Sequence, residues 1–219
     1  MAEPADLDAM FTDLLHTEDA PQRAAREAAD AAGMPPIEVS AQHAKLLQLL
    51  VTATGATTAL EIGTLAGYST IALARGVGPT GTVISLEYEA KHADVARASL
   101  AGAGVVDRVE VIVGAALNTL PTLADRRFDF FFIDADKENN PSYVEWAVKL
   151  AEPGALIVVD NIARNGRVLD PAPGDAQARA VRDMFVMIGE HPRLDAAAIQ
   201  TVGTKGWDGF AVARVLPEG

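Results

Sequence analysis

Several side chains that could do chemistry stand directly after apolar runs. Asp134, Asp136 and Lys137 follow the run in FDFFFIDADK, while Asp160 and Asn161 end the run in ALIVVDN. Carboxylate and amide oxygens are hard ligands of the kind that Mg²⁺, Mn²⁺ and Ca²⁺ take in proteins. A lysine that is partly buried near such an ion can serve as a general base. The types and positions of these residues are therefore compatible with proton transfer beside a metal ion.

The same residues also have a purely structural interpretation. An aspartate at the end of a strand often caps the next helix, and Asn140 with Pro141 offers a cap and a first turn here. If the strands ending at Asp134 and Asp160 are neighbours, two charges about 4 Å apart cost roughly 4 kcal/mol at an effective dielectric near 20. A cation between the carboxylates would remove that cost. Both interpretations, caps and metal site, stay open at this point.

A second group of strand ends favours a nucleoside ligand. EIGTLAGYST places Gly63 and Gly67 in a strand-to-helix turn, where glycine allows a ligand to approach the backbone closely. The segment lacks the G-x-G-x-x-G pattern, and Glu61 puts a carboxylate where that pattern receives a pyrophosphate. Glu87 ends the next run, where an acid can accept hydrogen bonds from both ribose hydroxyls. A positively charged nucleoside without phosphate, such as S-adenosylmethionine, fits this set; a turn without a ligand is the alternative.

The pattern of apolar runs predicts the elements that hold these residues. TALEIG, TVISLEY, RVEVIVG, FDFFFIDAD and ALIVVDN read as strands, and helical stretches of crossover length separate them. This alternation predicts an α/β fold with a parallel sheet covered by helices on both faces. LDAAAIQTVG and GWDGFAVARVL, joined by a turn, predict an antiparallel hairpin at the sheet edge. Ligands of such sheets bind at the carboxyl ends of the strands, and four of these five ends carry an acid, so the rim favours cations.

Length and composition limit the class of protein. The 219 residues, 49% of them apolar, suit a single domain over 1–219, with an N-terminal helical extension over 1–36 and a catalytic core over 37–219. Ser40 is the expected N-cap of the first core helix. The absence of cysteine leaves only oxygen or histidine to hold a metal. A net charge of −12 disfavours nucleic acid as a partner, and no apolar run could span a membrane, so we expect a cytoplasmic protein.

The segments EIGTLAGYST, LEYE, FIDADK and VVDN, in this order, resemble the metal-dependent O-methyltransferases of the catechol and caffeoyl-CoA type, bacterial members included. The resemblance covers the chain from about residue 37 to its end. It implies a Rossmann-like class I methyltransferase fold, with a seven-stranded, mostly parallel sheet whose last strand is antiparallel. It also implies S-adenosylmethionine as cofactor, Mg²⁺ as metal with Mn²⁺ or Ca²⁺ as substitutes, and a homodimer.

The resemblance further implies a role for individual residues. Lys137 matches the catalytic base, and the metal ligands match Asp134, Asp160 and Asn161. The cofactor contacts match Val39, Glu61, Gly63, Tyr68, Ser69, Glu87, Ala115 and Asp134. Among these, Glu87 would hold the ribose and Ala115 would lie at the adenine.

The acceptor side departs from the family pattern. Many relatives have bulky apolar or aromatic residues after the Asp-Asn pair, where this chain has Arg164 and Arg167. Both could be solvated loop charges; our hypothesis is that one of them faces the acceptor and selects an anionic phenol. The four histidines show no ligand-like spacing, so we expect surface or core residues rather than catalysts at His16, His43, His92 and His191.

Three functions remain open on the sequence. The leading one is metal-dependent transfer of a methyl group from S-adenosylmethionine to one hydroxyl of a catechol-like small molecule, a phenolic acceptor. The second is methylation of a hydroxyuridine in tRNA, against which the acidic net charge argues. The third is a protein that binds the cofactor without turnover, for which Lys137 and the metal ligands would not be needed. The apolar stripe containing Met10 and Phe11 could be a lid or a dimer contact.

Overall fold

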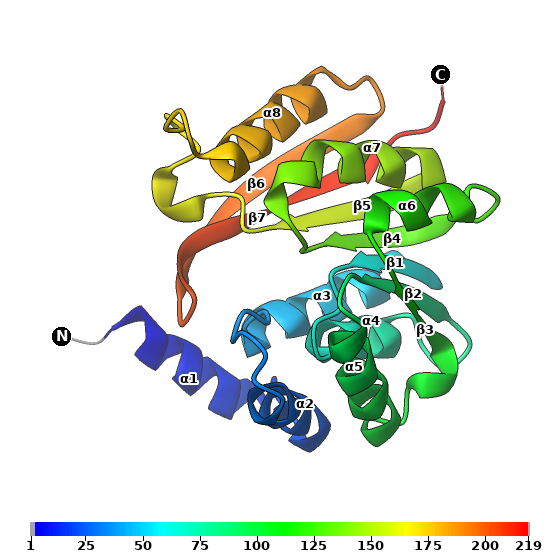
Figure 1. Ribbon diagram of the computed structural model, residues 1–219, viewed down its shortest axis with the longest axis vertical. Helices are drawn as coiled ribbons and strands as arrows, with labels where there is room; N and C mark the ends of the chain where they lie inside the picture. Colours follow the sequence, from blue (N-terminus) through cyan, green and yellow to red (C-terminus); the bar gives the residue numbers. More distant parts are fainter. Residues whose placement is uncertain (1–2, 219) are drawn as a thin grey trace.

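A seven-stranded sheet lies between two layers of helices in the computed structural model, which describes residues 3–218 (Figure 1). Its strands follow the order β3-β2-β1-β4-β5-β7-β6. They are β1 (Thr58–Ile62), β2 (Thr82–Glu87), β3 (Val109–Val113), β4 (Phe128–Ile133), β5 (Ala151–Asp160), β6 (Leu194–Gly203) and β7 (Gly206–Val215). The first five pair in parallel, and β7 is antiparallel to both of its neighbours. The predicted mostly parallel sheet with a C-terminal hairpin is confirmed, with β6 rather than β7 at the edge.

Helices cover both faces of the sheet, as the alternating pattern predicts. One layer contains α3 (Ala41–Thr54), α4 (Tyr68–Gly76) and α5 (Ala90–Gly102), and the other contains α6 (Ala116–Thr119), α7 (Asn140–Leu150) and α8 (Ala176–Glu190) (Figure 1). Short 3₁₀ turns lie at η1 (Val106–Arg108), η2 (Leu120–Leu123), η3 (Lys137–Asn139) and η4 (Arg164–Gly166). No helix in residues 3–218 has the length and apolar character that crossing a membrane requires.

The central strand β4 joins the two halves of the core. Phe130 and Phe132 pack with α3 and α4, while Phe128 and Phe131 pack with α7 and α8. All four side chains are buried, and each contributes about 1.5–3 kcal/mol of transfer free energy. The run of phenylalanines is therefore the doubly buried strand that its composition suggests, and it fixes the strand end from which the acidic residues project.

Residues 3–36, the described part of the N-terminal region, form the helices α1 (Pro4–Leu15) and α2 (Ala20–Ala31) and no strand. His16 ends the first helix in a left-handed conformation, and the Asp19 side chain caps the second by accepting from the Gln22 N–H. Ser40 caps α3 as predicted, because its hydroxyl accepts from the His43 N–H at 3.2 Å. The start of the core is thus set by local capping.

Two local expectations differ from the structure. Asn140 is not the cap of α7: it is the first helical residue, fully buried, and the N-cap position falls on Asn139, because the 3₁₀ turn η3 carries the chain into the helix. Helix α8 was not among the predicted elements. Its buried residues nevertheless follow a helical spacing, namely Ala178, Val181, Met184 and Ile188.

The end of β1 lies very close to the end of β4. The N–H of Gly63 donates to the Leu86 carbonyl, and the N–H of Asp134 donates to the Ile62 carbonyl, both at 2.9 Å. Gly63 has φ +103°, and a Cβ atom there would lie 2.2 Å from the backbone oxygen of Asp134. Only glycine satisfies both the conformation and the space at this point.

Replacing Gly63 by alanine should therefore strain the backbone at the point where β1 and β4 end. We expect Gly63→Ala to lower the free energy of unfolding by about 2–5 kcal/mol, combining a disfavoured positive φ with a steric clash. Gly78→Ala is the matched control, since Gly78 also has positive φ but open space around it, and it should cost about 1–2 kcal/mol. Urea denaturation measures both; equal losses would show that the close approach of the two strand ends is not the constraint.

Candidate active site

A cavity of about 740 Å³ opens at the carboxyl ends of the parallel strands. Its size is typical of a small-molecule site. It is lined by most of the predicted cofactor residues, namely Val39, Gly63, Tyr68, Ser69, Glu87 and Ala115. Asp134, Lys137 and Asn161 also line it. Residues far apart in the sequence are thus brought to one place by the sheet topology.

A second cavity, of about 630 Å³, lies beside the first. Asp160, His43 and Phe210 are among the residues that line it. The two cavities share five lining residues, which are Ile37, Glu38, Val39, Asn161 and Arg164. The predicted metal ligands therefore stand at the junction, with Asp134 on one side, Asp160 on the other and Asn161 on both.

Lys137 and Asp134 form an ion pair at this junction. Lys137 Nζ lies 2.7 Å from Asp134 Oδ1, and the lysine side chain is only 6% exposed. Lys137 follows Asp134 by three residues, and the turn of the chain between the end of β4 and η3 brings the ammonium back over the strand end. The lysine belongs to the cavity wall and not to the outer surface.

Asp160 is the last residue of β5 and lies at the same level as Asp134, which follows β4. These strands are neighbours, and their register pairs Ile133 with Val159, the residues just before the two acids. Burial raises the pKa of Asp160 well above its usual range, the charge of Asp134 raises it further, and Lys137 opposes this. The geometry therefore concentrates negative charge in a poorly solvated place, which favours a cation.

Asn161 stands beside Asp160 in an unusual backbone conformation. Its φ is 58°, in the left-handed region, and its N–H donates to Asp160 Oδ1 at 2.8 Å. Residues other than glycine that adopt this region are concentrated at functional sites. The conformation places Asn161 on the wall of both cavities.

His43 lies at the site although its spacing gave no sign of it. Its Nδ1 is 3.6 Å from Asp160 Oδ2, and its ring packs against Phe132 and Phe210 with centroids 5.9 Å and 5.0 Å away. Burial lowers the pKa of His43 to about 4, although the charge of Asp134 acts in the opposite direction. The imidazole is therefore neutral at pH 7. The Ser40 cap, which sets the start of α3, is the signal that could have placed His43 near the strand ends.

Glu61 occupies a different place from the other predicted cofactor residues. Its side chain is fully buried, it lines neither cavity, and its carboxyl oxygens accept from the hydroxyls of Ser69, Thr70 and Ser85 at 2.5–2.6 Å. Burial raises the pKa of Glu61 to about 7, against the lowering effect of these hydrogen bonds. Glu61 thus holds Ser69, which does line the cavity, and its own contact with a cofactor stays a prediction.

Glu87 fixes the turn that follows β1. Its Oε2 accepts from the N–H groups of Thr64 and Leu65 at 3.1 and 2.8 Å, and its Oε1 accepts from the Glu89 N–H at 3.0 Å. These bonds hold the carboxylate at the end of β2, where it lines the larger cavity. The position suits the predicted contact with ribose hydroxyls, which stays a prediction.

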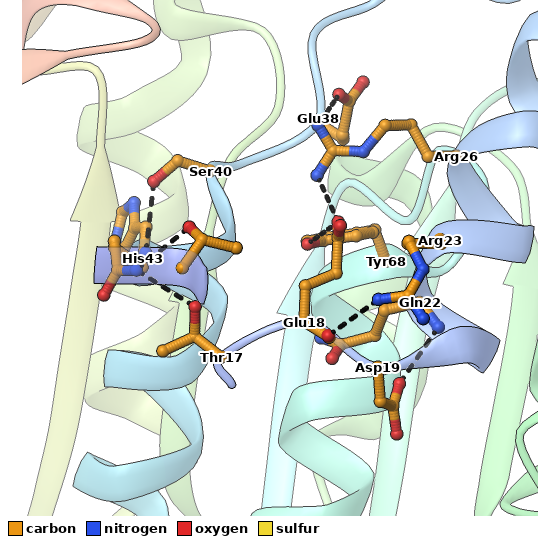
Figure 2. Close-up of polar contacts among 12 residues, drawn as sticks. Thr17, Glu18, Asp19, Gln22, Arg23, Arg26, Glu38, Ser40, His43 and Tyr68 are labelled. Carbon is orange, nitrogen blue, oxygen red and sulfur yellow. Dashed lines mark hydrogen bonds and ion pairs between the residues drawn. The ribbon is translucent and has the colours of Figure 1, made fainter. Parts of the chain in front are cut away.

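The N-terminal helices contribute to the cavity wall through a network of charges (Figure 2). Arg26 lies 2.8 Å from Glu18 and 3.3 Å from Glu38, and its guanidinium lies over the ring of Tyr68. The Tyr68 hydroxyl donates to Glu18 at 2.6 Å. Glu38 precedes Val39, so this network holds the cofactor-side segment against α2. The sequence did not indicate this charge network, because its residues lie on three separate segments.

Comparison with known proteins gives a consistent result. A family model described as O-methyltransferase matches residues 18–215. A protein from Mycobacterium tuberculosis named catechol O-methyltransferase is 58% identical, over 97% of this chain and 96% of its own. The solved O-methyltransferase from Bacillus cereus in complex with SAH is 45% identical, with TM-score 0.94 over 97% of this chain and 98% of its own. An O-methyltransferase from Streptomyces achromogenes involved in tomaymycin synthesis, in complex with SAM, is 43% identical, with TM-score 0.95 over 99% and 100% of the two chains.

The buried Glu61 should make stability depend on pH. In the folded protein its pKa is about 7, against an ordinary value of 4.5, so the folded state binds more protons between these values. The free energy of unfolding should then fall as pH rises from about 4.5 to 7, by up to about 3 kcal/mol from this group. Glu61→Gln cannot ionise, and this contribution should disappear.

Urea denaturation between pH 4.5 and 8, with EDTA present, measures the effect as the difference between wild type and variant. The exposed Glu110 on β3 supplies the control, and Glu110→Gln should keep the wild-type profile. Parallel profiles of wild type and Glu61→Gln would contradict the buried, proton-retaining state of Glu61.

Proposed function

The chain belongs to the O-methyltransferase family, and from this premise we propose that it transfers the methyl group of S-adenosylmethionine to one hydroxyl of a vicinal dihydroxy aromatic small molecule, with a divalent metal ion. The observation that carries the proposal is the ion pair of Lys137 and Asp134 at the junction of the two cavities, beside Asp160 and Asn161. The similarity to a protein named catechol O-methyltransferase supports the acceptor class.

The larger cavity is the proposed site for S-adenosylmethionine, whose sulfonium carries the methyl group. Complexes of two solved relatives with SAH and SAM support this assignment. Tyr68 and Ser69 begin α4 and line the cavity, so the N–H groups of this helix terminus suit the cofactor's carboxylate. Glu87 suits the ribose hydroxyls, and Asp134 offers a negative charge to the amino group.

Asp134, Asp160 and Asn161 are the proposed ligands of the metal ion. Within residues 3–218 no three His, Cys, Asp or Glu side chains form a metal cluster, so the donor set is two carboxylates and one amide oxygen. Such a set suits Mg²⁺, which keeps water or substrate in its remaining positions; Mn²⁺ or Ca²⁺ could replace it. When bound, the ion supplies Lewis-acid chemistry that lowers the pKa of a hydroxyl at the site.

Lys137 is the proposed general base. Asp134 holds its Nζ in place, and the side chain is almost completely shielded from water. As the neutral amine, Nζ would accept the proton of the acceptor hydroxyl; the oxygen would then attack the methyl carbon in line with the sulfur, and the S–CH3 bond would break to release S-adenosylhomocysteine. A protein that only binds the cofactor would have no use for a buried lysine at this point, and a net charge of −12 disfavours a tRNA acceptor.

The proposal predicts a methyl transfer that depends on both the metal and the lysine. Purified protein should transfer labelled methyl from S-adenosylmethionine to catechol with Mg²⁺, and EDTA should abolish the transfer. Lys137→Met should lower kcat by about 10²–10⁴-fold, which is the usual contribution of a general base.

Lys149→Met is the matched control, because Lys149 is exposed on α7, and it should leave kcat unchanged. Undiminished transfer in EDTA would overturn the metal role, and undiminished kcat in Lys137→Met would overturn the base. Binding of S-adenosylmethionine without transfer to a panel of catechols would favour the binding protein instead.

A homodimer is the second part of the proposal. Apolar side chains of α1 are exposed, namely Leu7, Met10, Phe11, Leu14 and Leu15, and the edge strand β6 is exposed along nearly its whole length. The two elements are adjacent, since Asp8 accepts from the Thr204 N–H at 2.8 Å just after β6. An unpaired edge strand beside apolar side chains suits a protein partner, here a second copy of the chain.

The exposed side chains of α1 and β6 form what we call the α1–β6 surface. Substitutions that introduce charged side chains there should dissociate the dimer. We expect light scattering after gel filtration to give a dimer for wild type and a monomer for the Leu14→Lys, Ile199→Lys double variant. Val186→Lys is the control, because Val186 is also exposed but lies on α8, which is not part of the α1–β6 surface. A monomeric wild type, or a double variant that stays dimeric, would contradict this part.

A further inference from the structure

We propose that Arg164 binds a carboxylate carried by the methyl acceptor, so that the enzyme selects acidic catechols over neutral ones. This inference rests on the proposed function and names the class of acceptor within it. It starts from a positive charge for which the described part of the chain, residues 3–218, provides no anion.

The guanidinium of Arg164 is partly buried and makes no ion pair within residues 3–218. Its Nη2 donates to the side-chain oxygen of Gln177, while its Nε is shielded from solvent and has no hydrogen-bond partner among those residues. A buried donor without a partner is destabilising, and more so when the group is charged. In a chain with 30 acidic residues, this isolation of an arginine indicates a position kept for an external anion.

The backbone directs Arg164 to the junction of the two cavities. The N–H groups of Ala163 and Arg164 donate to Asp208 Oδ1 at 2.8 and 3.1 Å, and Arg164 adopts a left-handed φ of 51°. Arg164 lies three residues after Asn161 in the sequence and lines both cavities. A group bound to its guanidinium would therefore belong to a molecule that also reaches the site of methyl transfer.

The carboxylates of the smaller cavity already have other partners. Asp208 accepts from two backbone N–H groups, Asp8 accepts from Thr204, and Glu38 pairs with Arg26 and with Lys205 at 3.3 and 3.4 Å. Asp160 accepts from the Asn161 N–H and is a proposed metal ligand. None of these acids forms an ion pair with the guanidinium of Arg164, which leaves that charge open to an anion carried by a ligand.

The cofactor also carries a carboxylate, which must be distinguished from that of the acceptor. The N-terminus of the nine-residue helix α4 lines the larger cavity and offers N–H donors to the cofactor carboxylate. Arg164 lines the smaller cavity as well as the larger one, whereas the residues that begin α4, Tyr68 and Ser69, line only the larger one. The acceptor is thus the ligand whose carboxylate lacks another donor.

The second arginine of the same loop has a different environment. Arg167 is exposed, and its Nη1 lies 2.7 Å from Asp175 Oδ2. It lines neither cavity. Of the two arginines that the sequence offered, the geometry points to Arg164, and Arg167 becomes the matched control.

The test compares 3,4-dihydroxybenzoate with catechol as acceptors for wild type, Arg164→Gln and Arg167→Gln. Wild type should have the lower KM for the acid. Arg164→Gln should raise the KM for the acid at least tenfold, as expected for loss of a charge-assisted hydrogen bond, and change that for catechol less than twofold. Arg167→Gln should change neither. Arg164→Glu should reverse the preference towards dopamine, a cationic catechol, a gain that a misfolded variant could not show.

Two further measurements separate the possible failures. Weaker binding of S-adenosylhomocysteine by Arg164→Gln in calorimetry, or an equal rise of both KM values, would assign Arg164 to the cofactor and overturn the proposal. Calorimetric binding of both acceptors, with S-adenosylhomocysteine and Mg²⁺ present, makes the comparison without turnover. Equal wild-type affinity for the two acceptors overturns the role of Arg164 even if methyl transfer occurs. Selective binding of the acid without methyl transfer would overturn the proposed function alone.

Discussion

Two carboxylates held side by side at the ends of β4 and β5 set the chemistry of this molecule. Asp134 and Asp160 follow strands that are hydrogen-bonded neighbours, in a place where burial alone already raises the pKa of Asp160. Much of the surrounding structure compensates for this charge. Lys137 pairs with Asp134, and the N–H of Asn161 donates to Asp160. His43, which is neutral at pH 7, adds no positive charge beside Asp160. The remaining negative charge supports the proposal that a divalent cation binds here.

The fold keeps these groups in place through close contacts of the backbone. The absence of a side chain at Gly63 lets the end of β1 approach the end of β4, and Glu87 binds the turn that follows. Arg26 links the segment before α3 to the N-terminal helices (Figure 2). The two cavities consequently share one wall, and Lys137, the proposed base, lines the larger of them.

The sequence predicted what depends on local pattern. Alternating apolar runs indicated the sheet, and the acids and the lysine after those runs indicated the site. What it could not predict depends on contacts between distant segments. The ring of His43 meets Asp160 through tertiary packing, Glu61 lies beneath the cavity rather than in its wall, and Arg164 differs from Arg167 only through the partners that the folded chain provides. Helix α8 was not predicted, although the spacing of its buried residues is that of one helix face.

The central claim is that Asp134, Asp160 and Asn161 hold a divalent ion within reach of Lys137. Diffraction from crystals grown with Mn²⁺ and S-adenosylhomocysteine tests it most directly, because manganese gives an anomalous signal that marks its own position. The account predicts one strong anomalous peak, with oxygens of all three residues at coordination distance and the Lys137 ammonium nearby. Crystals in which the cofactor is bound but this position shows no anomalous peak at saturating Mn²⁺ would contradict it.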